Sequence, residues 1–346
     1  MGATSGIGLR VAEIFAKAGW LVGAAGRKEK VMRKLQSDFP DRIRYAQIDI
    51  NATDAPSRLR DLIARLGGMD IYFHISGIGY ENEALITDHD TATAQTNVVG
   101  FTRMIDTAFR HFRSHGKRGR IAAVTSVAGT KGIGQLASYS ASKKYQQTYL
   151  TALDQLARMQ GLDISFTDIR PGWIRTPLLN PDRIYPMTMT LDHAVAGIIR
   201  AVIARKRVCV VDWRWDIAVR LWSLIPACIW ERIPLQVSTP ATPAQDRTDT
   251  QTEKELQSPE PPAQVKIPTP LQPTPQPTPQ PAPKTPQQPA PKPAPQSAPQ
   301  PKPQPTPQPV PASPSKNTET KTPKPTTEAA QMTPPAPPSK PVQPKP

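Results

Sequence analysis

Strand-like and helix-like segments alternate along the first 236 residues, and this alternation limits the fold more than any other feature of the sequence. Short apolar runs are separated by amphipathic stretches that are long enough to form helices, such as residues 28–39. This order favours right-handed crossovers between neighbouring strands, and therefore an α/β fold with a doubly wound parallel sheet. The expected strands are residues 21–25, 44–48, 71–75, 121–125, 164–168 and 208–211.

The last 110 residues have a different composition. Residues 237–346 hold 35 of the 43 prolines and contain no Phe, Trp or Tyr. Such a segment buries too little apolar surface to offset the conformational entropy that is lost on folding. We therefore expect residues 1–236 to form one domain and residues 237–346 to form a disordered, partly polyproline-II tail. The tail is either a solvated spacer or an arm that binds a partner.

A glycine-rich turn opens the chain, because residues 2–8 read Gly-Ala-Thr-Ser-Gly-Ile-Gly and a helical pattern follows them. Glycines in such a turn let backbone N–H groups approach a pyrophosphate at the positive end of a helix. The spacing is G-x-x-x-G-x-G rather than the older G-x-G-x-x-G. The turn is a candidate cofactor loop, although a glycine-rich turn alone is only a turn.

Tyr139 and Lys143 stand four residues apart in a helical stretch, so their side chains project from the same face. An ammonium close to a phenol favours the phenolate, so we expect the pKa of the Tyr139 phenol to fall toward the working pH. Ser126 lies thirteen residues before Tyr139 and supplies a hydroxyl that can hold the same substrate oxygen. This set suits proton exchange with an alcohol or a carbonyl oxygen.

These landmarks, with Asn97 and the run Pro-Gly-Trp-Ile-Arg-Thr at residues 171–176, occur in an order that resembles the classical short-chain dehydrogenase/reductase family over about residues 1–236. The resemblance implies a Rossmann-like fold and hydride transfer between a nicotinamide and a ketone or secondary alcohol. In the roles it implies, Tyr139 exchanges the proton and Ser126 positions the carbonyl. Lys143 lowers the Tyr139 pKa and contacts the nicotinamide ribose, while Asn97 distorts a helix and holds a water for proton relay.

The resemblance also assigns residues to the cofactor. Arg27 follows the expected strand at residues 21–25. A carboxylate at this place would accept the ribose hydroxyls of the cofactor, whereas an arginine favours a 2′-phosphate. NADP(H) is therefore the preferred cofactor and NAD(H) the alternative. Asp49 lies beside the adenine or caps a turn. At residues 74–77, where the family usually carries N-N-A-G, only Gly77 is retained, and His74 is expected to be packed at a strand end. The implied cofactor-binding residues are Gly2, Thr4, Ser5, Gly6, Ile7, Gly8, Arg27, Asp49, Ile50, Gly77, Tyr139, Lys143, Pro171, Gly172, Ile174 and Thr176.

In that family the glycine-rich turn follows a central strand, whereas only Met1 precedes Gly2 here. We expect a strand of about five or six residues to be missing from the middle of the sheet, through a start assigned too late or a fragment. A central strand supplies hydrogen bonds on both sides and apolar area on both faces, so its loss should destabilise the chain.

Two segments bear on the substrate side. Residues 178–187 stand where the family carries its substrate loop, and their mixture of apolar and polar residues indicates a modest, partly hydrophobic substrate. Residues 213–235 hold four tryptophans near helical spacing. They form either a lid or subunit-contact helix, or an interfacial helix at a membrane surface.

Charge and cysteine content limit the partners. The formal net charge of +15 divides into +11 for residues 1–236 and +4 for the tail, and the basic residues are scattered, which favours a solvated surface over nucleic-acid binding. Two cysteines make neither a disulfide framework nor a metal site, and we find no signal peptide and no apolar run of membrane-spanning length.

We expect a cytoplasmic homo-oligomer, a dimer or tetramer, either free or peripheral to the inner face of a membrane. The rival from another class is a non-catalytic cofactor-binding scaffold that works through the tail, which the intact Ser–Tyr–Lys set disfavours.

Overall fold

The computed structural model describes residues 1–116, 118–180, 183–237 and 239–240. Residues 241–346 lie outside the described residues, and so does the prediction that they form a disordered tail. The main helices are α1 (Gly6–Lys17), α2 (Glu29–Asp38), α3 (Ala55–Arg65), α4 (Thr87–Ala94), α5 (Phe101–His115), α6 (Ala137–Met159), α7 (Leu191–Ile203), α8 (Trp213–Ser223) and α9 (Ala227–Trp230). The strands are β1 (Val22–Gly26), β2 (Ile43–Gln47), β3 (Ile71–His74), β4 (Gly119–Val124), β5 (Ile164–Arg170), β6 (Arg183–Ile184), β7 (Val208–Val210) and β8 (Thr239–Pro240).

Parallel pairing joins the longer strands, in two sheets with the orders β1-β2 and β3-β4-β5-β7. All six strands expected from the sequence form, with ends that differ by at most two residues. The helices between them lie on both faces, so the prediction of a doubly wound parallel α/β fold is confirmed. Consecutive strands run in the same direction, and their carboxyl ends at His74, Val124 and Arg170 therefore meet at one edge.

Met1 lies between the two sheets, at the place where the family resemblance expects a central strand. Its amino nitrogen donates to Phe73 O (2.8 Å), and its carbonyl accepts from Ile75 N (2.9 Å), both beside β3. On the other side, Gly2 N donates to Ala25 O of β1 (2.8 Å). Within the described residues, β1 and β3 make no strand pair with each other, and residues 1–3 connect them at this edge.

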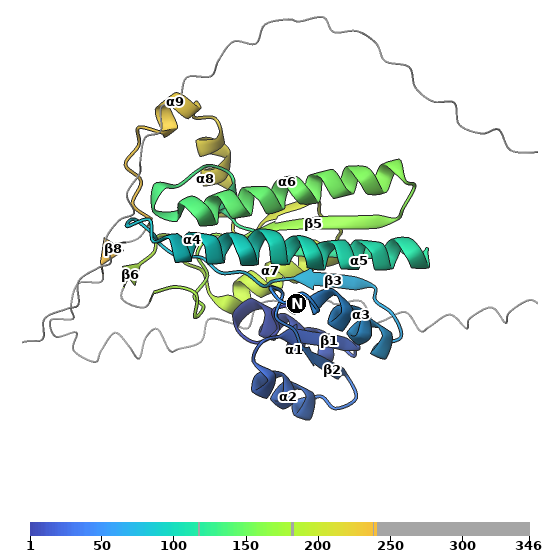
Figure 1. Ribbon diagram of the computed structural model, residues 1–346. Coiled ribbons are helices and arrows are strands. Elements are labelled where there is room, and N and C mark those ends of the chain that lie inside the picture. Colours follow the sequence, from blue (N-terminus) through green and yellow to red (C-terminus); the bar gives the residue numbers. More distant parts are fainter. Residues whose placement is uncertain (117, 181–182, 238, 241–346) are drawn as a thin grey trace, which may run out of the picture. The chain divides into compact units, whose positions relative to one another are not determined.

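The core has a layer on each side of the sheet (Figure 1). On one face, α3, α5 and α6 pack large side chains such as Phe101, Met104 and Leu150, all fully buried, against β3, β4 and β5. On the other face α1 packs against α7 through Phe15 and Ile199. Figure 1 shows α8 and α9, in gold, beyond the amino-terminal end of α6. That end of α6 is therefore the place where the strand-end loops and the last two helices can build a site.

Candidate active site

The loops at the carboxyl ends of β3, β4 and β5 enclose a cavity of about 930 Å³. Ser126, Tyr139 and Lys143 all line this cavity, so the structure brings together three of the four residues that the sequence predicted to be catalytic. Residues 77–79, 171–172, 174 and 176 also line this cavity. The remainder of its wall is largely apolar, with Trp173, Met187 and Trp222 among its members.

Tyr139 and Lys143 lie one turn apart on α6, with Lys143 Nζ 5.6 Å from the centroid of the Tyr139 ring. Lys143 is 4% exposed. Burial lowers the pKa of its ammonium to about 8, and the nearby Asp168 carboxylate opposes that shift. The Lys143 ammonium therefore titrates near neutral pH, and its charge depends on the groups that hold it.

The pKa of the Tyr139 phenol corrects a sequence-based expectation. Tyr139 is half-buried in the cavity wall. This burial raises the pKa above its ordinary value, while a hydrogen bond with the Ser126 hydroxyl lowers it in part. A cation near the phenol acts in the lowering direction, but in this structure burial dominates. The phenol is therefore protonated at pH 7 and suited to donate a proton to a carbonyl oxygen.

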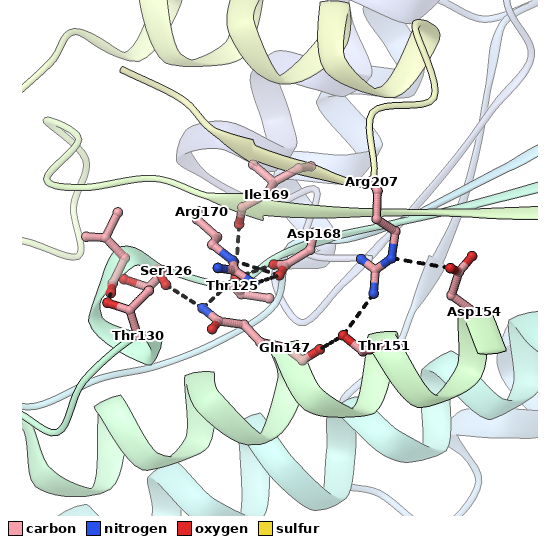
Figure 2. Close-up of polar contacts among 11 residues, drawn as sticks. Thr125, Ser126, Thr130, Gln147, Thr151, Asp154, Asp168, Ile169, Arg170 and Arg207 are labelled. Atoms are coloured by element: carbon pink, nitrogen blue, oxygen red, sulfur yellow. Dashed lines mark hydrogen bonds and ion pairs between the residues drawn. The ribbon is translucent and has the colours of Figure 1, made fainter. Parts of the chain in front are cut away.

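Ser126 follows β4 in an extended conformation and starts the 3₁₀ turn Val127–Gly129. Its Oγ accepts a hydrogen bond from Ala128 N (3.1 Å), and its carbonyl oxygen accepts one from Gln147 Nε2 of α6 (2.7 Å). Figure 2 shows the second contact. Ser126 is thus fixed through its own turn and from the helix that carries Tyr139 and Lys143.

A buried polar network lies behind the site (Figure 2). Thr125 Oγ1 donates to Asp168 Oδ1 (2.6 Å), and Arg170 Nε donates to Asp168 Oδ2 (2.8 Å). Asp168 is fully buried, so these two partners satisfy a carboxylate that would otherwise be costly. The sequence analysis missed Asp168 and Gln147. For Gln147, a signal exists, since it stands four residues after Lys143 and therefore on the same helix face.

Asn97 lies behind Lys143 rather than on the cavity wall. It belongs to the π-helical turn Gln95–Gly100 that connects α4 to α5. Its side chain clamps the loop after β3, because Oδ1 accepts from Ile78 N (3.0 Å) and Nδ2 donates to Ile78 O (2.7 Å). Its carbonyl oxygen accepts from Gln146 Nε2 (2.8 Å). The π-helical turn agrees with the helix distortion that the resemblance implied at Asn97, and the water that the resemblance places at this residue stays a prediction.

The glycine-rich turn folds back on the edge of the sheet before α1 begins at Gly6. Gly2 has φ +94°, which favours glycine, and a Cβ at Gly8 would lie 2.1 Å from the Gly2 carbonyl oxygen. Ser5 is the exposed residue before the helix, and Thr4 packs against Gly26 at the end of β1. The turn therefore presents the amino end of α1, the positive end of its dipole, at the cavity edge, where Ile7 lines the wall.

The remaining predicted cofactor residues divide into two groups. Thr176 lies across from Gly6 and lines the cavity with Pro171, Gly172 and Ile174, and we call residues 2–8 and 171–176 the cofactor wall. Arg27 is exposed directly after β1. Asp49 caps a turn, since its Oδ1 accepts from Asn51 N (3.0 Å), and the Ile50 side chain is buried in the core. Gly77 lies beside Asn97 and Lys143.

His74 is packed at the end of β3, as the sequence indicated. It is 1% exposed, its Nδ1 lies 3.2 Å from the Tyr72 hydroxyl, and its ring meets Phe101 edge-on at 5.0 Å. Burial holds the pKa of His74 well below its ordinary value, so the imidazole is neutral at pH 7.

Trp215, Trp222 and Trp230 line the side of the cavity that faces α8 and α9, and we call these three residues the tryptophan wall. Their indole N–H groups donate to Met187 O (3.2 Å), Thr130 Oγ1 (2.7 Å) and Gly132 O (2.7 Å) respectively. Neighbouring rings meet edge-on at 6.1 and 5.9 Å. This arrangement agrees with a lid. The packing also continues past residue 236, because Val237 is 8% exposed and β8 pairs with β6.

The cofactor wall, together with Arg27 and Lys143, fits a nicotinamide dinucleotide. The helix end and glycine turn suit a pyrophosphate, Arg27 suits a phosphate or ribose, and Lys143 offers an ammonium inside the cavity. When bound, the nicotinamide would supply or accept a hydride, while Tyr139 and Ser126 would serve the substrate oxygen. The fold and the site together define a dinucleotide-dependent oxidoreductase.

Comparisons with known proteins agree. The family model described as short chain dehydrogenase matches residues 1–184. An uncharacterized oxidoreductase of Myxococcus xanthus (strain DK1622) is 26% identical over 232 residues, which span 65% of this chain and 90% of that protein. A short-chain dehydrogenase/reductase from Burkholderia phymatum, solved in complex with NAD, has a TM-score of 0.59 at 16% identity and covers 68% of this chain and 94% of its own. A short-chain dehydrogenase from Sphingobium yanoikuyae, in complex with NADPH, has a TM-score of 0.55 at 20% identity and covers 65% of this chain and 94% of its own. This chain belongs to the short-chain dehydrogenase family, and it is an NAD(P)-dependent oxidoreductase.

Proposed function

We propose that the chain is an NADP(H)-dependent reductase of ketones, which in the reverse direction oxidises secondary alcohols. One observation carries the proposal, namely that the Ser126 hydroxyl, the Tyr139 phenol and the Lys143 ammonium meet at a single cavity next to the cofactor wall. A hydroxyl and a phenol on one side of a cavity can hold and protonate a carbonyl oxygen.

In the proposed reaction each residue has one task. Ser126 donates a hydrogen bond to the carbonyl oxygen of the substrate, and Tyr139 gives that oxygen its proton. Lys143 keeps a positive charge beside the phenol and holds the ribose of the cofactor, and Asn97 fixes the loop at Gly77 and Ile78. The preference for NADP(H) rests on Arg27, an exposed guanidinium at the end of β1 that suits a 2′-phosphate.

The apolar part of the cavity favours a substrate with an apolar body. The tryptophan wall and Met187 offer it rings and a thioether, whereas the polar groups lie near Ser126 and Tyr139. The test is a screen of NADPH and NADH oxidation over ketones that range from short and polar to long and apolar. We expect turnover with NADPH and an apolar ketone, and a screen with no turnover on any ketone would overturn the proposal.

A second candidate function, action on lipid-like ketones at an anionic membrane surface, is supported by the outer side of α8. Its exposed side chains Trp213 (72%) and Leu221 (62%), with Leu224 (78%) directly after the helix, follow helical spacing next to the tryptophan wall, on a domain with a net charge of +11. No helix in the described part of the chain is long and apolar enough to cross a membrane. The proposal is peripheral binding by a cytoplasmic homo-oligomer. Cosedimentation with phosphatidylserine-containing vesicles tests it, and a Trp213→Ser, Leu221→Ser variant should stay in the supernatant.

A further inference from the structure

Gln146 lies on α6 between Lys143 and the π-helical turn, and no water-accessible surface of it remains, since it is 0% exposed. Its Oε1 accepts a hydrogen bond from Lys143 Nζ (3.1 Å), and its Nε2 donates to Asn97 O (2.8 Å). The reverse orientation of the amide would place its NH₂ against an ammonium and its oxygen against a carbonyl. The two partners therefore fix the orientation of this side chain.

The position of Lys143 depends on few contacts. Within the described residues, its Nζ donates to Val124 O of β4 (3.1 Å) and to Gln146 Oε1. An ammonium has three N–H groups, so these two contacts leave one donor for a group in the cavity. Of the two acceptors, Val124 O is backbone, and Gln146 is the one whose removal a side-chain substitution can test.

We propose that Gln146 is a positioning residue of this site, which fixes the Lys143 ammonium by tying it to the backbone of the π-helical turn. The amide joins three elements of the fold, because it contacts α6 at Lys143, the turn at Asn97 and, through the shared ammonium, β4 at Val124. This inference rests on the proposed function, in which Lys143 acts as a cation beside Tyr139.

The hydrogen bond that Gln146 Oε1 accepts from Lys143 Nζ also stabilises the charged form of Lys143. The ionisable groups that face this ammonium are Tyr139 on α6, Asp168 on β5 and His74 on β3. Tyr139 is a neutral phenol and His74 a neutral imidazole at pH 7, so Asp168 supplies the negative charge. Because burial already lowers the Lys143 pKa to about 8, the loss of one acceptor should leave the lysine largely neutral at physiological pH.

We expect two substitutions of Gln146 to shift the Lys143 pKa in opposite directions. Gln146→Leu removes the acceptor at similar size, so the pKa of Lys143 should fall by about one unit, as expected for a hydrogen bond to a charged group. Gln146→Glu retains an acceptor and adds a negative charge, so the pKa of Lys143 should rise above 8. The fall in Gln146→Leu is the diagnostic result, because a purely structural role for Gln146 predicts no change in the Lys143 pKa in that variant.

The direct readout is an NMR titration of the ε-ammonium of Lys143 in cofactor-free protein with isotope-labelled lysine, assigned through Lys143→Met. The second readout is the pH at which carbonyl reduction declines, which should move down in Gln146→Leu and up in Gln146→Glu. Thr151→Val is the matched control on α6. It removes hydrogen bonds with Gln147 O and Arg207 (Figure 2), so it should lower thermal stability without moving either pH value.

The outcomes separate this inference from the proposed function. Opposite pKa shifts support the role of Gln146 even if no ketone is turned over, in which case only the proposed function fails. An unchanged Lys143 pKa in both variants, or a shift of the same sign in both, would overturn the inference even if the wild type reduces ketones. If Gln146→Leu fails to fold, Gln146→Met, which also lacks the acceptor, takes its place, since a fall in the Lys143 pKa supports the role and no fall contradicts it.

Discussion

The two walls of the cavity are built in different ways. The cofactor wall is built around glycines at residues 2, 6, 8 and 172 and the amino end of α1, and it meets the cavity at Ile7 and at residues 171–174 and 176. The tryptophan wall consists of large side chains from α8 and α9, which pack onto the loop at residues 130–132. Backbone geometry tolerates little change, whereas a wall of side chains can vary while the fold persists. We therefore expect substitutions at the cofactor wall to weaken cofactor binding, and substitutions at the tryptophan wall to change which substrate is preferred.

Among substitutions in the two walls, the largest effect is expected at Gly8. An alanine there would place its Cβ 2.1 Å from the Gly2 carbonyl oxygen, so the turn must shift. Overpacking of this kind costs about 1–3 kcal/mol, and NADPH affinity should fall by about 10- to 100-fold. Fluorescence titration with NADPH measures this affinity. Gly134→Ala is the control, because nothing lies within 4 Å of a Cβ at that position.

Arg27→Asp should have a similar or slightly smaller effect, confined to one cofactor. A charge-assisted hydrogen bond to a phosphate contributes about 1.5–3 kcal/mol, so the NADPH Kd should rise by about tenfold or more while NADH binding changes little. Lys34→Asp, on the exposed side of α2, changes the net charge by the same amount, and it should leave the Kd values for NADPH and NADH unchanged. A wild type that prefers NADH would contradict the assignment of Arg27.

At the tryptophan wall we expect a change in KM rather than in cofactor binding. Trp222→Ala removes an apolar ring and a hydrogen bond to Thr130, so KM for an apolar ketone should rise about tenfold, in the range of apolar pocket contacts. NADPH affinity should stay the same. Trp213→Ala is the matched control, since Trp213 is 72% exposed. Equal effects of the two substitutions would remove the distinction between the walls.

The smallest effect is expected from removal of the Pro-rich segment. A chain that ends at Pro240 should keep the unfolding temperature and turnover of the full chain, because a segment without aromatic residues adds little to a core. A chain that ends at Leu235 should bind substrate more weakly, since Val237 lines the cavity and its N–H donates to Gln135 Oε1 (2.8 Å). Loss of turnover in the longer chain, with its fold intact by circular dichroism, would contradict this account.

The sequence predicts local patterns well, but it does not predict contacts that form only in the packed fold. The glycine spacing, the Tyr139–Lys143 pair and the strand order are local patterns, and each predicted the element in which it lies. The direction of the Tyr139 pKa was wrong because burial depends on the packing of the whole site. Gln146 and Asp168 were missed because their partners Asn97 and Thr125 are distant in sequence. The tryptophans of residues 213–235 were noticed, but not their distant partners, such as Thr130 for Trp222.

The central claim is that Tyr139 is the proton donor of an NADPH-dependent reduction. Tyr139→Phe keeps the ring and removes the hydroxyl, so it separates chemistry from binding. With wild-type and variant protein, the measurements are the NADPH Kd by fluorescence titration and the rate of ketone reduction under saturating NADPH. The account predicts an unchanged Kd and a rate lower by about 10²- to 10⁴-fold, the usual contribution of general acid catalysis. A variant that reduces the ketone at the wild-type rate would contradict it.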